Sequence, residues 1–295
     1  MTNIYSSKIY LDKISNELLD PLGRCIAKKV NWIYLPNISK NDKDLYPVAI
    51  IGEGSPVLAI HGFDSSFLEY RRLVPLLEKK NKLIIPDLFG FGFCPRPENI
   101  EYNLEMQIKH LNDIIDTCVK KDSLGVIAAS MGGTVALELA RKHAKKINKL
   151  LLLSPAGVCT KPQKIPRPLD TIGTSFLKQK YVRRALCRQS FSNPNKSVAA
   201  PELEIASIHL DVPGWQMSLA SFARNGGASN YGKPLPPQPI NIIWGAQDRI
   251  INRKERIKTM NYMNKTLKEE KNCGHLPHLD IPEKVAEKWK EFEKS

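Results

Sequence analysis

The segment Leu124-Gly-Val-Ile-Ala-Ala-Ser-Met-Gly-Gly-Thr-Val-Ala-Leu137 decides the fold that we expect for this chain. It begins as a continuous apolar run, typical of a strand buried on both faces, and passes through Ser130 into a helical pattern. A serine on so sharp a turn requires small residues two positions before and after it, and Ala128 and Gly132 are small. Glycine is more usual than alanine at the first of these positions. The turn aims the Ser130 hydroxyl at a helix N-terminus, where amide groups favour developing negative charge, so we predict that Ser130 is a nucleophile.

The rest of the chain alternates short apolar runs with longer helical patterns. This alternation predicts the α/β class, with a mostly parallel central sheet flanked by helices. The predicted strands are 57–60, 83–85, 124–128, 147–153 and 240–244, with 46–51 as an outer strand. The predicted helices of this core are 67–79, 104–119, 131–143, 254–264 and 282–293.

One stretch interrupts the alternation. Residues 155–239 contain no clear strand and hold eleven of the chain's 21 prolines, which predicts an inserted helical cap over 158–237, with short helices within 171–191 and 203–222. An apolar stripe in the cap is either its own core or a wall of an apolar pocket; it consists of Trp215, Met217, Leu219 and Phe222. The α/β core then comprises 46–157 and 238–295. Residues 1–45 show no clear period and form an N-terminal extension of uncertain structure.

Charge and cysteine content limit the setting in which the protein works. The net charge is +14, but the lysines are spread along the chain, so we expect a generally basic surface rather than a nucleic-acid site. Positive charge plus an apolar cap would suit peripheral contact with an anionic membrane. The six cysteines are single, without metal or disulfide spacing, and the first residues lack the apolar core of a signal peptide. These features predict a cytoplasmic protein with reduced thiols, and they leave its oligomeric state open.

A serine needs a base to remove its proton and a carboxylate to orient that base. After the strand 240–244 comes Gly-Ala-Gln-Asp248, which places a carboxylate in the loop at the carboxyl end of that strand. Further on, Asn-Cys-Gly-His275 precedes the last predicted helix. The order Ser130, Asp248, His275 therefore predicts a catalytic triad with His275 as general base and Asp248 as its orienting acid.

Neighbouring residues offer alternatives to these assignments. His278 lies three positions after His275 and competes with it as the base, and Cys273 is a weaker candidate for the nucleophile. His61 follows a predicted strand, where a histidine more often shapes its loop than catalyses. That loop matters through its backbone, because we expect the N–H groups of Phe63 and Met131 to form the oxyanion hole.

Five motifs resemble the α/β-hydrolase superfamily in its serine-nucleophile branch. They are the turn at Ser130 together with His61-Gly-Phe-Asp64, Asp87-Leu-Phe-Gly-Phe-Gly92, Trp244-Gly-Ala-Gln-Asp248 and Gly274-His-Leu-Pro-His278. More narrowly, His61-Gly-Phe-Asp-Ser-Ser66, Leu68-Glu-Tyr-Arg-Arg72 and the Phe-Gly-Phe-Gly loop are similar to the chlorophyll dephytylase group of plants and its cyanobacterial relatives. That narrower resemblance, over about 30 residues, implies cleavage of a phytyl ester.

We therefore expect a serine hydrolase that cleaves a carboxylic ester through an acyl-enzyme intermediate, the substrate being an apolar small molecule such as a long-chain or phytyl ester. A serine rather than an aspartate at the turn argues against dehalogenases and epoxide hydrolases of this fold. A carbon–carbon bond hydrolase and a non-catalytic binding or accessory protein remain the alternatives. The chain has no phosphate-binding glycine loop or metal-ligand cluster, so we expect no cofactor and no metal.

Overall fold

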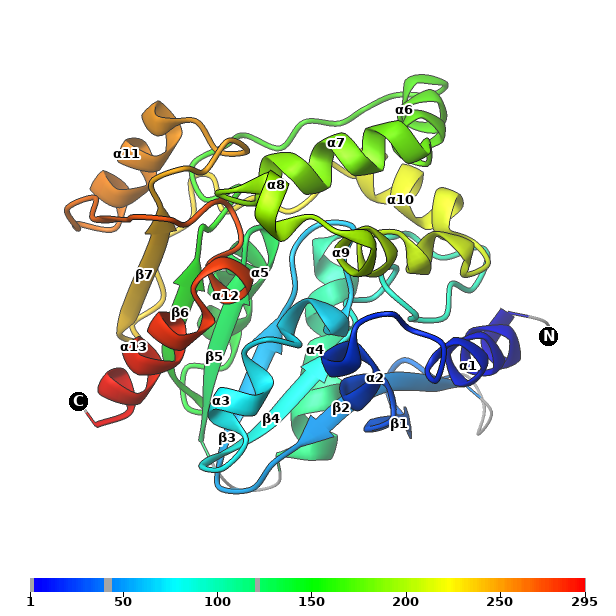
Figure 1. Ribbon diagram of the computed structural model, residues 1–295, viewed down its shortest axis with the longest axis horizontal. Coiled ribbons are helices and arrows are strands. Elements are labelled where there is room, and N and C mark those ends of the chain that lie inside the picture. Colours follow the sequence, from blue (N-terminus) through cyan, green and yellow to red (C-terminus); the bar gives the residue numbers. More distant parts are fainter. Residues whose placement is uncertain (1–2, 40–43, 120–122, 295) are drawn as a thin grey trace.

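The computed structural model describes residues 3–39, 44–119 and 123–294, whose centre is an eight-stranded sheet (Figure 1). The strand order is β1-β2-β4-β3-β5-β6-β7-β8. Strands β3 to β8 pair in parallel, whereas β2 pairs antiparallel with both β1 and β4. The strands are β1 (Val30–Tyr34), β2 (Leu45–Ile51), β3 (Ser55–Ile60), β4 (Asn81–Pro86), β5 (Leu124–Ala129), β6 (Ile147–Leu153), β7 (Ile240–Gly245) and β8 (Glu269–Glu270). The predicted α/β-hydrolase fold is thus confirmed, including the six predicted strands.

Helices cover both faces of the sheet, and the strand residues divide between them with period two. In β3, Leu58 and Ile60 pack under α4 (Leu104–Cys118) and α5 (Met131–Lys142). Val57 and Ala59 pack on the opposite face, under α3 (Val74–Leu77) and α13 (Pro282–Lys294). Because both faces are buried, the central strands read as continuous apolar runs.

Residues before β2, which the sequence left unplaced, belong to the body of the protein. Helices α1 (Asn3–Ile14) and α2 (Pro21–Ala27) precede β1. Their side chains join the cluster on the α3 and α13 face of the sheet, which includes Leu11, Leu18 and Ile26. Asp20 caps α2 by accepting from the amides of Leu22 and Gly23. Its other oxygen accepts from Arg71 at 2.6 Å, which ties the N-terminal helices to the core.

Between β6 and β7 the chain crosses above the carboxyl ends of the strands as a set of helices without a strand (Figure 1). They are α6 (Leu169–Leu177), α7 (Lys180–Ser190), α8 (Pro194–Ser197), α9 (Ala200–Ile205), the 3-10 turn η2 (Ile208–Asp211) and α10 (Trp215–Arg224). In the stripe predicted on α10, Trp215, Leu219 and Phe222 are buried against the main core, and Met217 packs beside them. The stripe therefore anchors the cap on the core.

The predicted helix over 67–79 is wrong in its continuity. A 3-10 turn covers Phe67–Tyr70, and a separate short helix, α3, begins only at Val74. Pro75 lacks an N–H and is tolerated in the first turn of α3, where no intrahelical donor is needed. The remaining elements are α11 (Arg253–Tyr262) and α12 (Pro277–Asp280). Among the helices of the described ranges, none is both long and apolar enough to cross a membrane.

Candidate active site

Ser130 occupies a strained turn between β5 and α5. Its φ and ψ are 49° and −122°, a conformation that a non-glycine residue adopts only when the surroundings enforce it. Its N–H donates to Leu153 O at 2.8 Å, and its carbonyl accepts from the amides of Gly133 and Ala156. A Cβ at position 132 would lie 2.6 Å from the carbonyl oxygens of Ile60 and His61, which explains why the residue two positions after the serine is glycine.

His275 lies against this serine. Its Nε2 is 2.8 Å from Ser130 Oγ, and its Nδ1 is 3.0 Å from Asp248 Oδ2. When Nδ1 carries the proton and donates it to Asp248, Nε2 is free to accept the proton of the Ser130 hydroxyl. The three side chains predicted from the sequence are thus brought together in one continuous hydrogen-bonded line.

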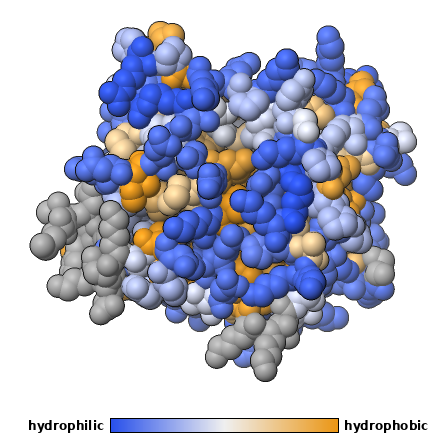
Figure 2. All heavy atoms as spheres, turned by 180° about the vertical axis from the view of Figure 1, so that it is seen from behind, coloured by the Kyte–Doolittle hydropathy of each residue, from blue (hydrophilic) through white to orange (hydrophobic). Residues whose placement is uncertain are grey.

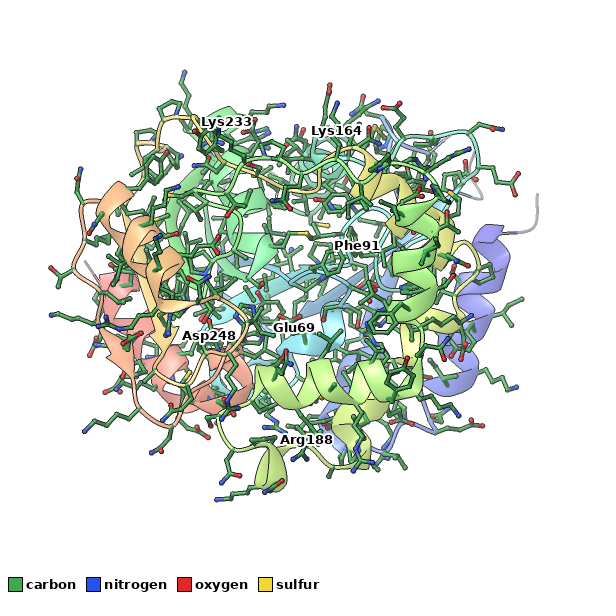
Figure 3. All side chains as sticks on the ribbon, turned by 90° about the horizontal axis from the view of Figure 1, so that it is seen from above. Glu69, Phe91, Lys164, Arg188, Lys233 and Asp248 are labelled. Carbon is green, nitrogen blue, oxygen red and sulfur yellow. The ribbon has the colours of Figure 1, made fainter. Side chains whose placement is uncertain are left out.

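Asp248 is held by four donors, two on each oxygen. Oδ2 accepts from His275 and from Trp244 Nε1, and Oδ1 accepts from the amides of Ile250 and Ile251. Burial raises the pKa of this carboxyl, but the hydrogen bond and charge of His275, with the other donors, hold the pKa below its ordinary value. Asp248 is therefore an ionised acceptor with a fixed orientation. Figure 3 looks down on this edge of the sheet, with Asp248 in the loop after β7 and Glu69 nearer the centre.

The other histidines of the region have different partners. His278 Nε2 lies 3.0 Å from Glu69 Oε1, and its ring stacks on Tyr70 with centroids 5.0 Å apart, so its partners are Glu69 and Tyr70 rather than Ser130. His61 Nε2 accepts from Leu88 N at 2.9 Å, which leaves Nδ1 to donate to Gly62 O at 2.8 Å. Burial lowers the pKa of His61 to about 4, so a neutral ring braces the loop after β3.

That loop carries one of the two amides expected to bind an oxyanion. A Cβ at Gly62 would lie 3.3 Å from Ser130 Cβ, so the loop that leads into Phe63 passes directly beside the nucleophile. Met131 is the first residue of α5, and the first amides of a helix have no partner within it. The segments that carry both amides thus adjoin Ser130, and the oxyanion hole itself stays a prediction. Cys273, by contrast, is fully buried, and burial raises the pKa of its thiol.

The contacts by which the cap holds this loop were not indicated by the sequence. Asp64, which follows Phe63, is buried at φ 48° and pairs with Arg183 of α7. The same carboxyl is 3.1 Å from His209 Nε2 and accepts from Trp215 Nε1 at 2.8 Å. Burial opposes ionisation, but His209 and Arg183 hold the pKa of Asp64 well below its usual range. The sequence shows an acidic residue at position 64 but not its partners, which lie more than 100 residues further along the chain.

A cavity of about 240 Å³ opens onto Ser130 and His275. Its walls come from the loop after β3, from α7, from α9 and from the histidine loop. The apolar part of the lining comprises Phe63, Leu177, Leu186, Cys187, Phe191, Ile205, Ala206, Ile250, Leu276 and Leu279. The α10 stripe, which the sequence offered as a pocket wall, is not part of this lining.

The cavity wall consists of described residues. Each charged side chain in it lies against a side chain of opposite charge or against a histidine. Arg71 pairs with Asp20 and Glu202, and Arg183 pairs with Asp64. Glu69 lies against His278. The wall is thus mainly apolar, and its cations and carboxylates already have partners within the protein.

Comparison with known proteins places the chain in a family. The model of the alpha/beta hydrolase fold matches residues 55–282, and the chain belongs to this family. Three relatives are similar over most of their length. Alpha/beta hydrolase domain-containing protein VTE7 of Arabidopsis thaliana is 24% identical, over 96% of this chain and 89% of the relative. The 2-hydroxymuconate semialdehyde hydrolase of Pseudomonas sp. (strain CF600) is 32% identical, over 80% and 85%. Lipase 1 of Psychrobacter immobilis is 25% identical, over 86% and 82%.

Proposed function

We propose that this chain is a serine hydrolase that cleaves an uncharged carboxylic ester through an acyl intermediate on Ser130. The observation that carries the proposal is the line from Ser130 Oγ through His275 to Asp248, with contacts of 2.8 and 3.0 Å. A serine hydroxyl becomes an effective nucleophile only where a base of this kind removes its proton.

The reaction would follow from this geometry in two steps. His275 Nε2 takes the proton of Ser130 as Oγ attacks the ester carbonyl, while the amides of Phe63 and Met131 donate to the developing oxyanion. The protonated His275, stabilised by Asp248, gives its proton to the departing alcohol. Water, deprotonated by His275, then attacks the acyl group and releases the acid from Ser130.

The charges around the cavity favour a neutral substrate. A carboxylate or ammonium group that leaves water for an apolar cavity needs an opposite charge there. Arg71 and Arg183 are already engaged by the carboxylates of Asp20, Glu202 and Asp64. An ester of an apolar acid and an apolar alcohol meets no such cost, and the lipase among the relatives supports this choice.

The similarity of the segments at 61–66 and 68–72 to the chlorophyll dephytylase group makes a phytyl or other long-chain ester the narrower proposal. Cavities for small-molecule ligands commonly measure about 300 to 1,000 Å³. A cavity of about 240 Å³ suffices for the atoms around the scissile bond. The remainder of a long chain would extend out of it, over the cap or into a surrounding apolar phase.

A carbon–carbon bond hydrolase is the second candidate, and the relative that is 32% identical favours it. The name of that relative's substrate is that of a carboxylate, which would require an unpaired cation in the cavity. Because both arginines of the lining are paired, we rank this candidate second.

The test is hydrolysis of p-nitrophenyl esters from acetyl to palmitoyl by the wild type and by Ser130→Ala, with chlorophyll a and a semialdehyde of the muconate type as separate substrates. Ser130-dependent ester turnover supports the proposal, and release of chlorophyllide supports the narrower one. Turnover of the semialdehyde alone would favour the second candidate. If none of these substrates is turned over and an organophosphonate fails to label Ser130, the chain is a binding protein of this fold.

A further inference from the structure

Helix α6 of the cap exposes its apolar side chains and buries its polar ones, which is the reverse of an ordinary surface helix. Leu169, Ile172 and Phe176 recur at helical spacing, yet their side chains are 58%, 59% and 53% exposed. The buried residues of the same helix are polar, namely Asp170 and Thr174. A surface helix normally turns its apolar stripe toward the core. Here that stripe faces outward.

Specific contacts fix α6 in this orientation. Asp170 pairs with Arg224 of α10, and Gln216 of α10 donates to Ser175 Oγ at 2.7 Å. A helix rotated to bury its apolar stripe would lose these contacts. The apolar surface continues beyond the helix, because the ring of the exposed Tyr181 lies 6.1 Å from that of Phe176. We call Leu169, Ile172, Phe176 and Tyr181 the α6 face.

The surroundings of the α6 face are strongly basic. Residues 158–190 contain eight lysines and arginines but a single acidic residue, Asp170, which is buried and paired. The exposed basic residues of this segment are Lys161, Lys164, Arg167, Lys178, Lys180 and Arg184. In the view from behind, the upper corner of the molecule that carries α6 shows apolar atoms among hydrophilic ones (Figure 2).

We propose that the α6 face docks on an anionic lipid surface. Peripheral membrane contacts combine apolar side chains, which enter the boundary between headgroups and acyl chains, with lysines and arginines that bind anionic headgroups. The α6 face and its basic border supply both on one side of the cap. A second copy of the chain fits poorly as the occupant, because two such borders would repel each other.

This docking rests on the proposed function and deepens it by naming where the ester is found. Helix α6 ends at Leu177, and Leu177 lines the cavity that opens onto Ser130. The next helix, α7, contributes Arg183, Leu186 and Cys187 to the same cavity. A long-chain ester taken from the bilayer would thus pass from the docked helix to the nucleophile along one connected part of the cap.

The experiment is co-sedimentation with vesicles of phosphatidylcholine alone and with vesicles that also contain phosphatidylserine, at low and high salt. Ser130→Ala protein is used so that hydrolysis does not alter the vesicles. We expect binding only to the phosphatidylserine vesicles, weakened by salt. The double variant Ile172→Ser/Phe176→Ser should bind at least about tenfold more weakly, since it removes two apolar side chains that docking would bury in the lipid. Lys178→Glu/Lys180→Glu should also weaken binding.

The matched control is Ile9→Ser on α1, because Ile9 is equally exposed, at 59%, but does not belong to the α6 face. This variant should bind as the parent does. Ile172→Ser/Phe176→Ser in the otherwise wild-type chain should keep full activity on a water-soluble short ester and lose activity on a long-chain ester carried in anionic vesicles. Circular dichroism confirms that the variants fold.

Several results would overturn the docking. The protein could bind neither kind of vesicle, or Ile172→Ser/Phe176→Ser could bind as well as its parent. Size-exclusion chromatography could also show that this substitution converts a dimer to a monomer. A failure of the proposed function has a different signature. In that case the vesicles are bound through the α6 face, but no ester shows Ser130-dependent turnover.

Discussion

Replacing Asp248 by asparagine tests the proposed relay, which is the line of hydrogen bonds from Asp248 through His275 to Ser130. Its two oxygens accept four hydrogen bonds, from His275, from Trp244 and from the amides of Ile250 and Ile251. Asparagine has the same shape but one acceptor oxygen. If that oxygen keeps the two amides, the NH2 group faces His275 Nδ1 and Trp244 N–H.

The consequence for His275 sets the size of the effect. An NH2 group donates to Nδ1, which places the ring proton on Nε2 and leaves no acceptor for the Ser130 hydroxyl. The corresponding change in a serine protease triad slows turnover about 10⁴-fold, equivalent to about 5 kcal/mol of transition-state stabilisation. The fold should survive, because the two backbone amides keep their acceptor.

The assay is kcat/KM on the best p-nitrophenyl ester, beside urea unfolding of the same protein. We expect a fall of roughly 10⁴ for Asp248→Asn with a loss of unfolding free energy of only about 1 to 3 kcal/mol. Ser130→Ala provides the baseline without a nucleophile. A folded Asp248→Asn protein within about tenfold of wild-type activity would refute the relay, since another carboxylate must then orient His275.

Three further outcomes follow from buried groups. Asp64→Asn leaves the buried Arg183 without its counter-ion and should cost about 3 kcal/mol in urea unfolding and lower kcat, whereas Asp116→Asn, in an exposed pair, should cost under about 1 kcal/mol; equal losses would contradict this. Burial lowers the pKa of His110 to about 3, so unfolding binds a proton below pH 6.5 and stability falls with acid; His110→Leu should reduce the loss between pH 7 and 5 by about 2 kcal/mol, and an unchanged pH profile would exclude this account. Cys273→Ala should retain ester hydrolysis and the wild-type protein should resist alkylation at that site, because burial raises the pKa of the thiol; abolished activity with an intact fold would return Cys273 to consideration.

The sequence predicted the parallel core well because its strands are buried on both faces. Runs such as 124–128 and 147–153 are apolar throughout, which is a signal that local reading detects. Strand β1 was missed because it lies at the sheet edge, where Val30–Tyr34 alternates only weakly between partly buried and exposed residues. Strand β8 has two residues and no apolar side chain, so no periodicity could have indicated it.

The candidate site divides in the same way between local and distant information. Ser130, Asp248 and His275 each follow a predicted strand or precede a helix in a fixed order, so spacing was sufficient to select them. The structure agrees with the choice of His275 over His278, because His275 contacts Ser130 Oγ whereas His278 lies against Glu69. Partners of Asp64 depend on how the cap folds back over the core, and no spacing in the sequence encodes that contact.

In the proposed function, those cap contacts couple substrate selection to catalytic geometry. Arg183 holds Asp64 beside the predicted oxyanion amide of Phe63, and the carbonyl of Ser190, at the end of the same helix, accepts from His275 N at 2.8 Å. Helix α7 therefore touches both the loop that would bind the oxyanion and the loop that carries the base, while its inner side forms the cavity wall. A shift of the α7 backbone that reshapes the cavity would also act on these two loops through Arg183 and Ser190. Variants selected for a new ester should accordingly show changes in kcat as well as in KM, because binding and the reacting geometry share one helix.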